Sequence, residues 1–134
     1  MPGSISMAAG GNITPSSFLV LVSGSDRVVN VAGAGNKCVG ISREWHRLPP
    51  WEGLDDGYIA ILNDSVPHYD YGLDQEALLQ LGGTVAVGDY LKSDASGHGV
   101  TASSDGDEYG AIAIEAGNVG DIVKVQMTRG MRGA

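Results

Sequence analysis

Residues 81–129, LGGTVAVGDYLKSDASGHGVTASSDGDEYGAIAIEAGNVGDIVKVQMTR, decide the fold, because in them short apolar runs alternate with turn signals. In the last run, residues 122–128, apolar Val123, Val125 and Met127 alternate with polar side chains. This period of two is typical of a strand with one face in the core and the other in water. Glycine and aspartate lie between the runs, where they let the chain reverse at little cost. The stretch therefore predicts a series of β-strands joined by tight turns.

Two of these turns have nearly the same sequence, VGDYL at residues 87–91 and VGDIV at residues 119–123. In each, the glycine supplies the bend, the aspartate can accept backbone N–H bonds, and the next two residues begin a strand. Gly-Asp is among the commonest turn dipeptides, so two ordinary turns explain the echo at least as well as a shared purpose does.

The motifs GDYLKSDASGHG, YGAIAIEAG and GDIVKV, which follow one another from about Gly82 onwards, resemble the capsid decoration (cement) proteins of tailed bacteriophages. In that family a GD-L-x-x-D-x-x-G stretch precedes an x-G-x-A-x-E-x-A-x-x-G-D-x-V-x-V stretch near the end of a small β-rich protein. The resemblance implies a virion protein without catalytic residues that binds the outside of an expanded capsid shell, often as a homotrimer. The implied partners are the major capsid protein and further copies of the chain. The implied location is the capsid exterior, after assembly in the host cytoplasm.

The composition agrees with a turn-rich β protein. A chain of 134 residues is one domain by length, its 21 glycines follow no period, and 43% of its residues are hydrophobic. We predict an all-β fold, a small barrel or sandwich of about eight short antiparallel strands with at most one short helix. The expected organisation is a flexible N-terminal arm (residues 1–17), a single β domain (residues 18–129) and a C-terminal tail (residues 130–134).

Two further patterns assign local structure outside the deciding stretch. The runs FLVLV at residues 18–22 and RVVNV at residues 27–31 flank a turn and predict a β-hairpin. Residues 74–81, DQEALLQL, give the one helix signal, with Asp74 as N-cap and Gly82 as stop. A helix of this length would be held by packing and not by propensity.

The net charge of −8 argues against nucleic acid as a partner, because its phosphates would be repelled. The acidic residues cluster between Glu52 and Asp121, where Lys92 is the single cation, and both ends of the chain are net basic. A solvated acidic face is one explanation, and basic ends that meet an acidic partner are the other. The chain has no apolar run of about 18 residues and no signal-peptide pattern, so we expect synthesis in a cytoplasm and no membrane partner. A lone cysteine, Cys38, excludes an internal disulfide.

Residues 42–57, SREWHRLPPWEGLDDG, hold both tryptophans, and Trp and Arg often anchor protein interfaces. Two interpretations remain open: this loop docks on a partner, or it plugs one end of a barrel. The start of the chain is likewise either disordered or ordered by a neighbouring subunit. The candidate capsid or subunit contacts are Ile5, Met7, Ile13, Trp45, Arg47, Pro49, Pro50, Trp51, Arg129 and Arg132.

The sequence predicts no catalytic, metal or cofactor site. Residues 32–36, AGAGN, lack the spacing of a phosphate-binding loop. Residues 104–108, SDGDE, could converge on Ca²⁺ but lack the EF-hand order of ligands, so a plain acidic turn explains them better. His46, His68 and His98 have no partner at metal-ligand spacing. We therefore expect a protein that is not an enzyme.

Three functional hypotheses follow. The first is a structural cement protein that clamps neighbouring capsid subunits and stabilises the shell. The second is a carbohydrate- or host-surface-binding β module that stacks sugars on Trp45, Trp51, Tyr69 and Tyr71. The third, a small β-barrel hydrolase, is the weakest because no nucleophile and base can be named.

Overall fold

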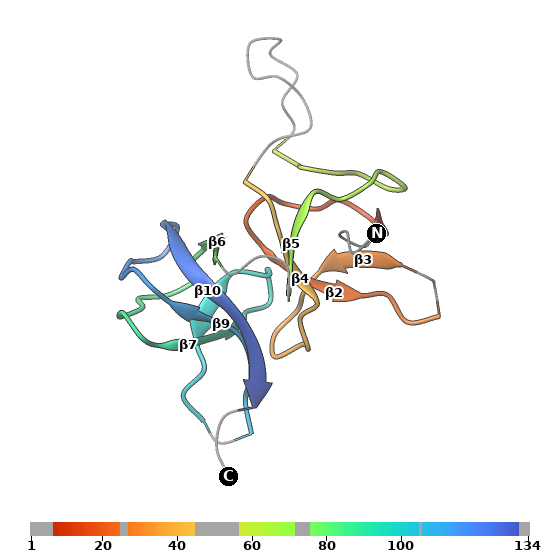
Figure 1. Cartoon of the computed structure of the whole chain (residues 1–134). Helices are drawn as coiled ribbons and strands as arrows, with labels where there is room; N and C mark the ends of the chain where they lie inside the picture. Colours follow the sequence, from red (N-terminus) through yellow and green to blue (C-terminus); the bar gives the residue numbers. More distant parts are fainter. Residues whose placement is uncertain (1–6, 25–26, 45–56, 72–75, 105, 132–134) are drawn as a thin grey trace.

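The computed structural model describes residues 7–24, 27–44, 57–71, 76–104 and 106–131. Within these ranges it contains no helix, and its ten strands form two five-stranded sheets that lie side by side (Figure 1). The all-β prediction is therefore confirmed.

The first sheet is built mainly from the N-terminal half of the chain. Its strand order is β1-β3-β2-β4-β5, and the predicted hairpin forms its centre as β2 and β3. All its pairs are antiparallel except β1 with β3, which is parallel, unlike the purely antiparallel expectation. The bounds are β1 (Ala8–Ala9), β2 (Phe18–Leu21), β3 (Val28–Val31), β4 (Gly40–Ser42) and β5 (His68–Asp70).

The second sheet contains the stretch that decided the prediction, and its order is β6-β10-β9-β7-β8. It curls into a half-barrel, because its two edge strands approach each other at a bridge between Leu81 and Gly99. There the N–H of Gly82 donates to the carbonyl of Gly99 at 2.9 Å. The bounds are β6 (Glu76–Gln80), β7 (Tyr90–Ser93), β8 (Gly99–Thr101), β9 (Glu108–Ala113) and β10 (Ile122–Met131).

The predicted helix at residues 74–81 is wrong, because residues 76–80 form strand β6. The side chains of Ala77, Leu79 and Leu81 are all buried, which is the period of two that a strand requires. One edge of strand β10 hydrogen-bonds to this segment, and all five residues of β6 have partners in β10. A short isolated helix could not match that pairing, since its few internal bonds barely offset the cost of nucleation. The proposed N-cap, Asp74, lies outside the described residues.

Two hydrophobic cores lie on opposite faces of the first sheet. Phe18 and Ile41 point toward the second sheet and pack there with Leu79, Leu91 and Val125. The other core covers the opposite face and is formed by Met7, Ala9, Ile13, Leu19, Val29, Ile59, Ala60 and Val66. Because β2 contributes to both cores, its sequence is a continuous apolar run and not an alternating one.

Residues 7–17, the described part of the expected N-terminal arm, pack as an integral part of the domain. Ala8 and Ala9 pair with β3, and the side chain of Ile13 is fully buried. The N–H of Ile13 donates to the carbonyl of Ala60, and the N–H of Ile59 donates to the carbonyl of Ile13, both at 2.9 Å. The isolated apolar residues of this segment therefore complete the outer core of the first sheet. The first six residues lie outside the described ranges.

Four turns have the same hydrogen-bonding pattern, and two of them are the turns with the nearly identical sequences VGDYL and VGDIV. They span residues 61–64, 86–89, 104–107 and 118–121, and each ends in an aspartate whose Oδ2 accepts the N–H of the first residue at 2.9–3.1 Å. The aspartate N–H in turn donates to the carbonyl of that first residue. The third position has a positive φ, at Asn63, Gly88, Gly106 and Gly120. The carboxylates therefore stabilise the turns that order the strands.

Ser42 joins β4 to the buried end of the N-terminal segment. Its Oγ donates to the carbonyl of Thr14 at 2.7 Å and accepts the N–H of Ser17 at 3.0 Å. We expect Ser42→Ala to lower the free energy of unfolding by about 1–3 kcal/mol, because the buried N–H of Ser17 and the partly buried carbonyl of Thr14 lose their partner. Urea denaturation followed by circular dichroism measures this. Ser103→Ala, at an exposed serine, is the control, and equal losses in both variants would contradict the role of Ser42.

Candidate functional site

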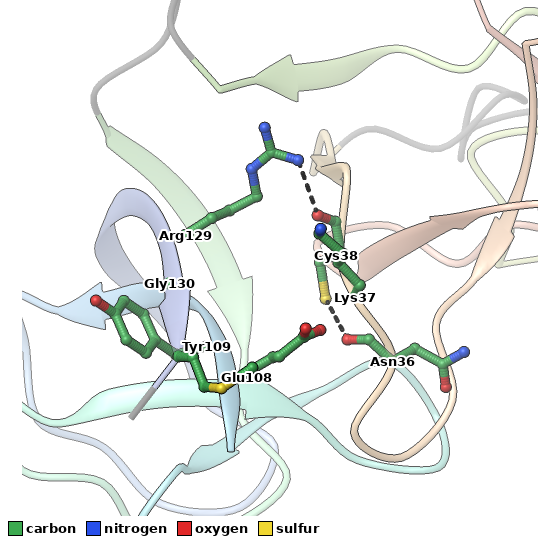
Figure 2. A pocket seen from close by; sticks show the side chains of 8 residues that line it. Asn36, Lys37, Cys38, Glu108, Tyr109, Arg129 and Gly130 are labelled. Atoms are coloured by element: carbon green, nitrogen blue, oxygen red, sulfur yellow. Dashed lines mark hydrogen bonds between the residues drawn. The ribbon is translucent and has the colours of Figure 1, made fainter. Parts of the chain in front are cut away.

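A pocket of about 430 Å³ lies where the β3–β4 loop faces the start of β9 and the end of β10 (Figure 2). The loop contributes three residues, β9 contributes two, and β10 contributes three. The lining residues are Asn36, Lys37, Cys38, Glu108, Tyr109, Arg129, Gly130 and Met131. The pocket therefore joins parts of the two sheets that are far apart in the sequence.

A β-bulge in β10 places Arg129 at this pocket. The pairing of β10 with β9 shifts register between Met127 and Gly130, and bulges of this kind commonly redirect a side chain. The guanidinium carbon of Arg129 lies 4.5 Å from the centroid of the Tyr71 ring. Its Nη1 also donates to the carbonyl of Cys38 at 3.5 Å, a long and weak bond. Arg129 is thus oriented mainly by its contact with Tyr71, and its side chain is exposed.

Tyr71, whose ring lies under the Arg129 guanidinium, is itself held by a hydrogen bond. Its hydroxyl donates to the carbonyl of Gly110 at 2.6 Å. Burial raises the pKa of the Tyr71 phenol, with a further contribution from Cys38, and Arg129 opposes both. The phenol therefore stays protonated at physiological pH and keeps its hydrogen bond.

Cys38 contributes a buried, neutral thiol to the floor of the pocket. Burial, assisted by the negative charge of Glu108 and opposed by Arg129, raises the pKa of Cys38 to about 12. Its Sγ–H points at the carbonyl of Asn36, 3.5 Å away. Since the thiolate is the nucleophile and metal ligand, Cys38 acts here as a packing residue and not as a reactive one.

Tyr109 forms the wall on the β9 side, and Tyr90 packs against its ring. The rings of Tyr90 and Tyr109 pack with centroids 4.4 Å apart and an interplanar angle of 45°. Gly130 leaves room for this arrangement, because a Cβ at that position would overlap the Tyr109 ring. The glycine after Arg129 therefore belongs to the construction of the pocket.

The predicted contact residues separate into three groups. Arg129 lines the pocket, whereas Met7 and Ile13 are buried in the outer core of the first sheet. In this conformation the side chains of Met7 and Ile13 are not available to a partner. The remaining candidates lie outside the described residues: Ile5, Trp45, Arg47, Pro49, Pro50, Trp51 and Arg132.

The residues just before the tryptophan-containing segment are held against β5. Arg43 lies 4.2 Å over the Tyr69 ring, and the Tyr69 hydroxyl donates to Glu44 Oε1 at 2.7 Å. Burial and this bond to Glu44 raise the pKa of Tyr69 to about 12. Arginines thus lie over one ring face of both Tyr69 and Tyr71, and that face of each ring is not open for stacking with a sugar.

Two of the described candidate metal ligands, His68 and Asp107, have protein partners. His68 Nδ1 donates to the carbonyl of Val66 at 2.6 Å. Asp107 Oδ2 accepts both Lys92 Nζ and the N–H of Ser104, each at 3.1 Å. Among the residues that the structure describes, no three His, Cys, Asp or Glu side chains converge on a possible metal position. The same residues include no helix long and apolar enough to cross a membrane.

Sequence reasoning found Arg129 but not the pocket around it. Arg129 was singled out for its charge near the basic end of the chain, whereas Tyr71, its stacking platform, comes from an unrelated position in the sequence. Gly130 within a strand pattern was a usable signal, since an isolated glycine there often marks a bulge or a close approach.

No family model and no curated protein sequence matches the chain. Its fold is similar to a solved structure, the N base of the head fiber gp8.5 of bacteriophage phi29, with a TM-score of 0.63. The alignment covers 97% of each chain at 16% sequence identity. This similarity therefore concerns the whole chain, and at this level of identity it concerns the fold.

Proposed function

We propose that the protein is a structural component of a bacteriophage head, a decoration or cement protein that binds the outer surface of the shell and stabilises it. The observation that carries the proposal is the fold similarity to a phage head fiber base over 97% of both chains. The resemblance of the motifs after Gly82 to phage decoration proteins supports the same class independently, because it comes from sequence and not from the fold.

The proposed mechanism is clamping by several contacts at once. The protein would act as a homotrimer, each copy of which contacts the major capsid protein, on a shell assembled in the host cytoplasm. Each contact can be weak, since the linked contacts raise the effective concentration of the others and all must open before the trimer leaves. The two sheets suit this use because they share a core that fixes their relative position.

We also propose that the protein has no enzymatic activity. The neutral Cys38 thiol and the protonated Tyr71 phenol support this, since both groups are held in their unreactive forms. The four aspartates at the turns also have structural partners, because each accepts a backbone N–H of its own turn.

We expect the purified protein to sediment with mature capsid shells and to raise the temperature at which they disassemble. Co-sedimentation and a thermal melt of the shells measure these two effects, and an acidic protein of similar mass controls for trapping. Analytical ultracentrifugation should give about three times the 13.8 kDa chain mass. Shells that neither pellet the protein nor change their melting temperature would contradict the proposed function, and a monomer that still binds would remove only the trimer.

A further inference from the structure

We propose that the pocket between the β3–β4 loop and the ends of β9 and β10 is a socket for an acidic side chain of the capsid shell protein. The inference rests on the proposed function and names the part of the molecule that would contact the shell. Arg129 would hold the carboxylate, Lys37 would add a second positive charge, and Tyr109 would form the wall beside them.

Arg129 is oriented for such a ligand before the ligand arrives. Its guanidinium carbon lies 4.5 Å from the centroid of the Tyr71 ring, and the Tyr71 hydroxyl donates to the carbonyl of Gly110 at 2.6 Å. A guanidinium held in this way loses little side-chain entropy when it binds, and its planar fork matches the two oxygens of a carboxylate. The single bond that Nη1 donates, to the carbonyl of Cys38, is 3.5 Å long and leaves the stronger donors for a ligand.

The two cations of the pocket have no acidic partner in the described part of the chain. The ion pairs there join Lys92 to Asp107 and Lys124 to Glu76, and neither Arg129 nor Lys37 takes part in one. Both side chains are exposed, so their charges remain accessible to a partner. A locally positive site on an acidic protein favours an acidic segment of a partner over the body of a second copy, which would repel it.

Glu108 places a negative charge on one side of the pocket, so the two sides of the pocket differ in charge. In Figure 2 its carboxylate lies beside Asn36 and Cys38, whereas the guanidinium of Arg129 lies on the far side of Cys38. An incoming carboxylate therefore binds on the side of Arg129 and Lys37. Glu108 remains free to accept a backbone N–H of the same partner segment, yet its charge still opposes an acidic ligand.

The size of the pocket fits one acidic side chain and the backbone next to it. Its volume of about 430 Å³ is in the lower part of the range of small-ligand pockets. Met131 lies at the rim and is 63% exposed, so a partner could bury part of it and add apolar contact area.

Titration of the ¹⁵N-labelled protein with hexaglutamate tests the site without any capsid. We expect saturable shifts at the amides of Lys37, Cys38 and Gly130, and none with hexaglutamine. Arg129→Gln should weaken binding about tenfold or more, because a charge-assisted bond is lost. Glu108→Gln should tighten it several-fold, since it removes a repulsion. Lys124→Gln, which removes a positive charge from the exposed face of β10, is the matched control and should leave the affinity unchanged.

Equal weakening by Arg129→Gln and Lys124→Gln would overturn the socket, because binding would then follow net charge alone. So would weaker binding by Glu108→Gln. Each variant is first shown to unfold at the same urea concentration as the wild type, so that a folding defect is not mistaken for lost contact.

Co-sedimentation of the same variants with mature shells separates the socket from the proposed function. Wild type that pellets while Arg129→Gln stays in solution supports both. Wild type and Arg129→Gln that pellet equally would overturn the socket and leave the cement function intact. Wild type that fails to pellet would refute the cement function and the shell as the partner, even where hexaglutamate binds. If Arg129→Gln no longer gives the mass of a trimer in analytical ultracentrifugation, the proposal would also be overturned. The carboxylate that Arg129 binds would then belong to a second copy of the chain.

Discussion

Phe18→Ala is expected to lower the free energy of unfolding by about 3–5 kcal/mol. Phe18 is the largest fully buried side chain of the described residues and lies in the core between the two sheets. A Cβ on Gly110 of β9 would lie 2.8 Å from Phe18 Cε1, which shows how closely the ring packs on the opposite sheet. Its removal leaves a cavity that two hydrogen-bonded sheets cannot readily close.

Urea denaturation followed by circular dichroism measures this loss, and Leu21→Ala is the matched control. Leu21 is in the same strand but 51% exposed, so its truncation should cost well under half as much. Because a domain of this size is stabilised by only about 5–15 kcal/mol, the Phe18 variant should be partly unfolded at moderate temperature. Equal losses at the two positions would mean that the inter-sheet core is not what stabilises the domain.

The hairpin predicted from the apolar runs at residues 18–22 and 27–31 and the strand predicted from the alternation at residues 122–128 are both present in the structure. The apolar run at residues 58–62 forms no strand and contributes only an isolated bridge at Ala60. Residues 122–128 alternate because one face of β10 packs in the inter-sheet core and the other faces water. The run at residues 18–22 begins with Phe18 and Leu19, which are buried in the cores on opposite faces of β2, so its first residues do not alternate with polar ones. In both cases the pattern reflects which side chains of that strand are buried. It can therefore be recognised in the sequence without knowing which strand pairs with it.

The segments that were misassigned depend on partners that the sequence does not identify. In residues 76–80 the helix-forming residues Glu, Ala, Leu and Gln lie along the edge of β10, and the pairing overrides their propensity. Residues 7–17 were predicted to belong to a flexible arm, because their apolar residues are isolated in the sequence. They are buried only because residues 59–66 lie beside them over the same face of the first sheet.

The candidate site was less predictable than the fold for the same reason. Arg129, Tyr71 and Cys38 meet through a bulge, an inter-sheet contact and a loop, none of which leaves a periodic signal. Charge alone pointed to Arg129 and equally to Arg132, which lies outside the described residues. Residue type suggested contact, but only the register shift in β10 places Arg129 on its tyrosine.

Gly97→Ala is expected to lower the free energy of unfolding by more than backbone strain alone accounts for. Gly97 has a φ of +81°, a conformation that costs an alanine about 1–2 kcal/mol. A Cβ there would also overlap Val31 Cγ1 and lie 3.3 Å from the carbonyl oxygen of Phe18. The carbonyl of Gly97 accepts the N–H of Phe18 at 2.8 Å, so any shift of the turn disturbs one of the hydrogen bonds that join the two sheets.

Gly24→Ala separates strain from crowding in the same assay. Gly24 has a φ of +84°, and nothing lies within 4 Å of the position its Cβ would occupy. Its variant should therefore lose the strain energy and no more, whereas Gly97→Ala should lose about a further 1–3 kcal/mol from overpacking. If both variants unfold at the same urea concentration, the β7–β8 turn can shift to accommodate the added Cβ without a further loss of stability. The two sheets would then not be rigidly joined at this point. A loose joint there would weaken the clamping mechanism too, since a clamp requires its contacts to keep fixed positions relative to one another.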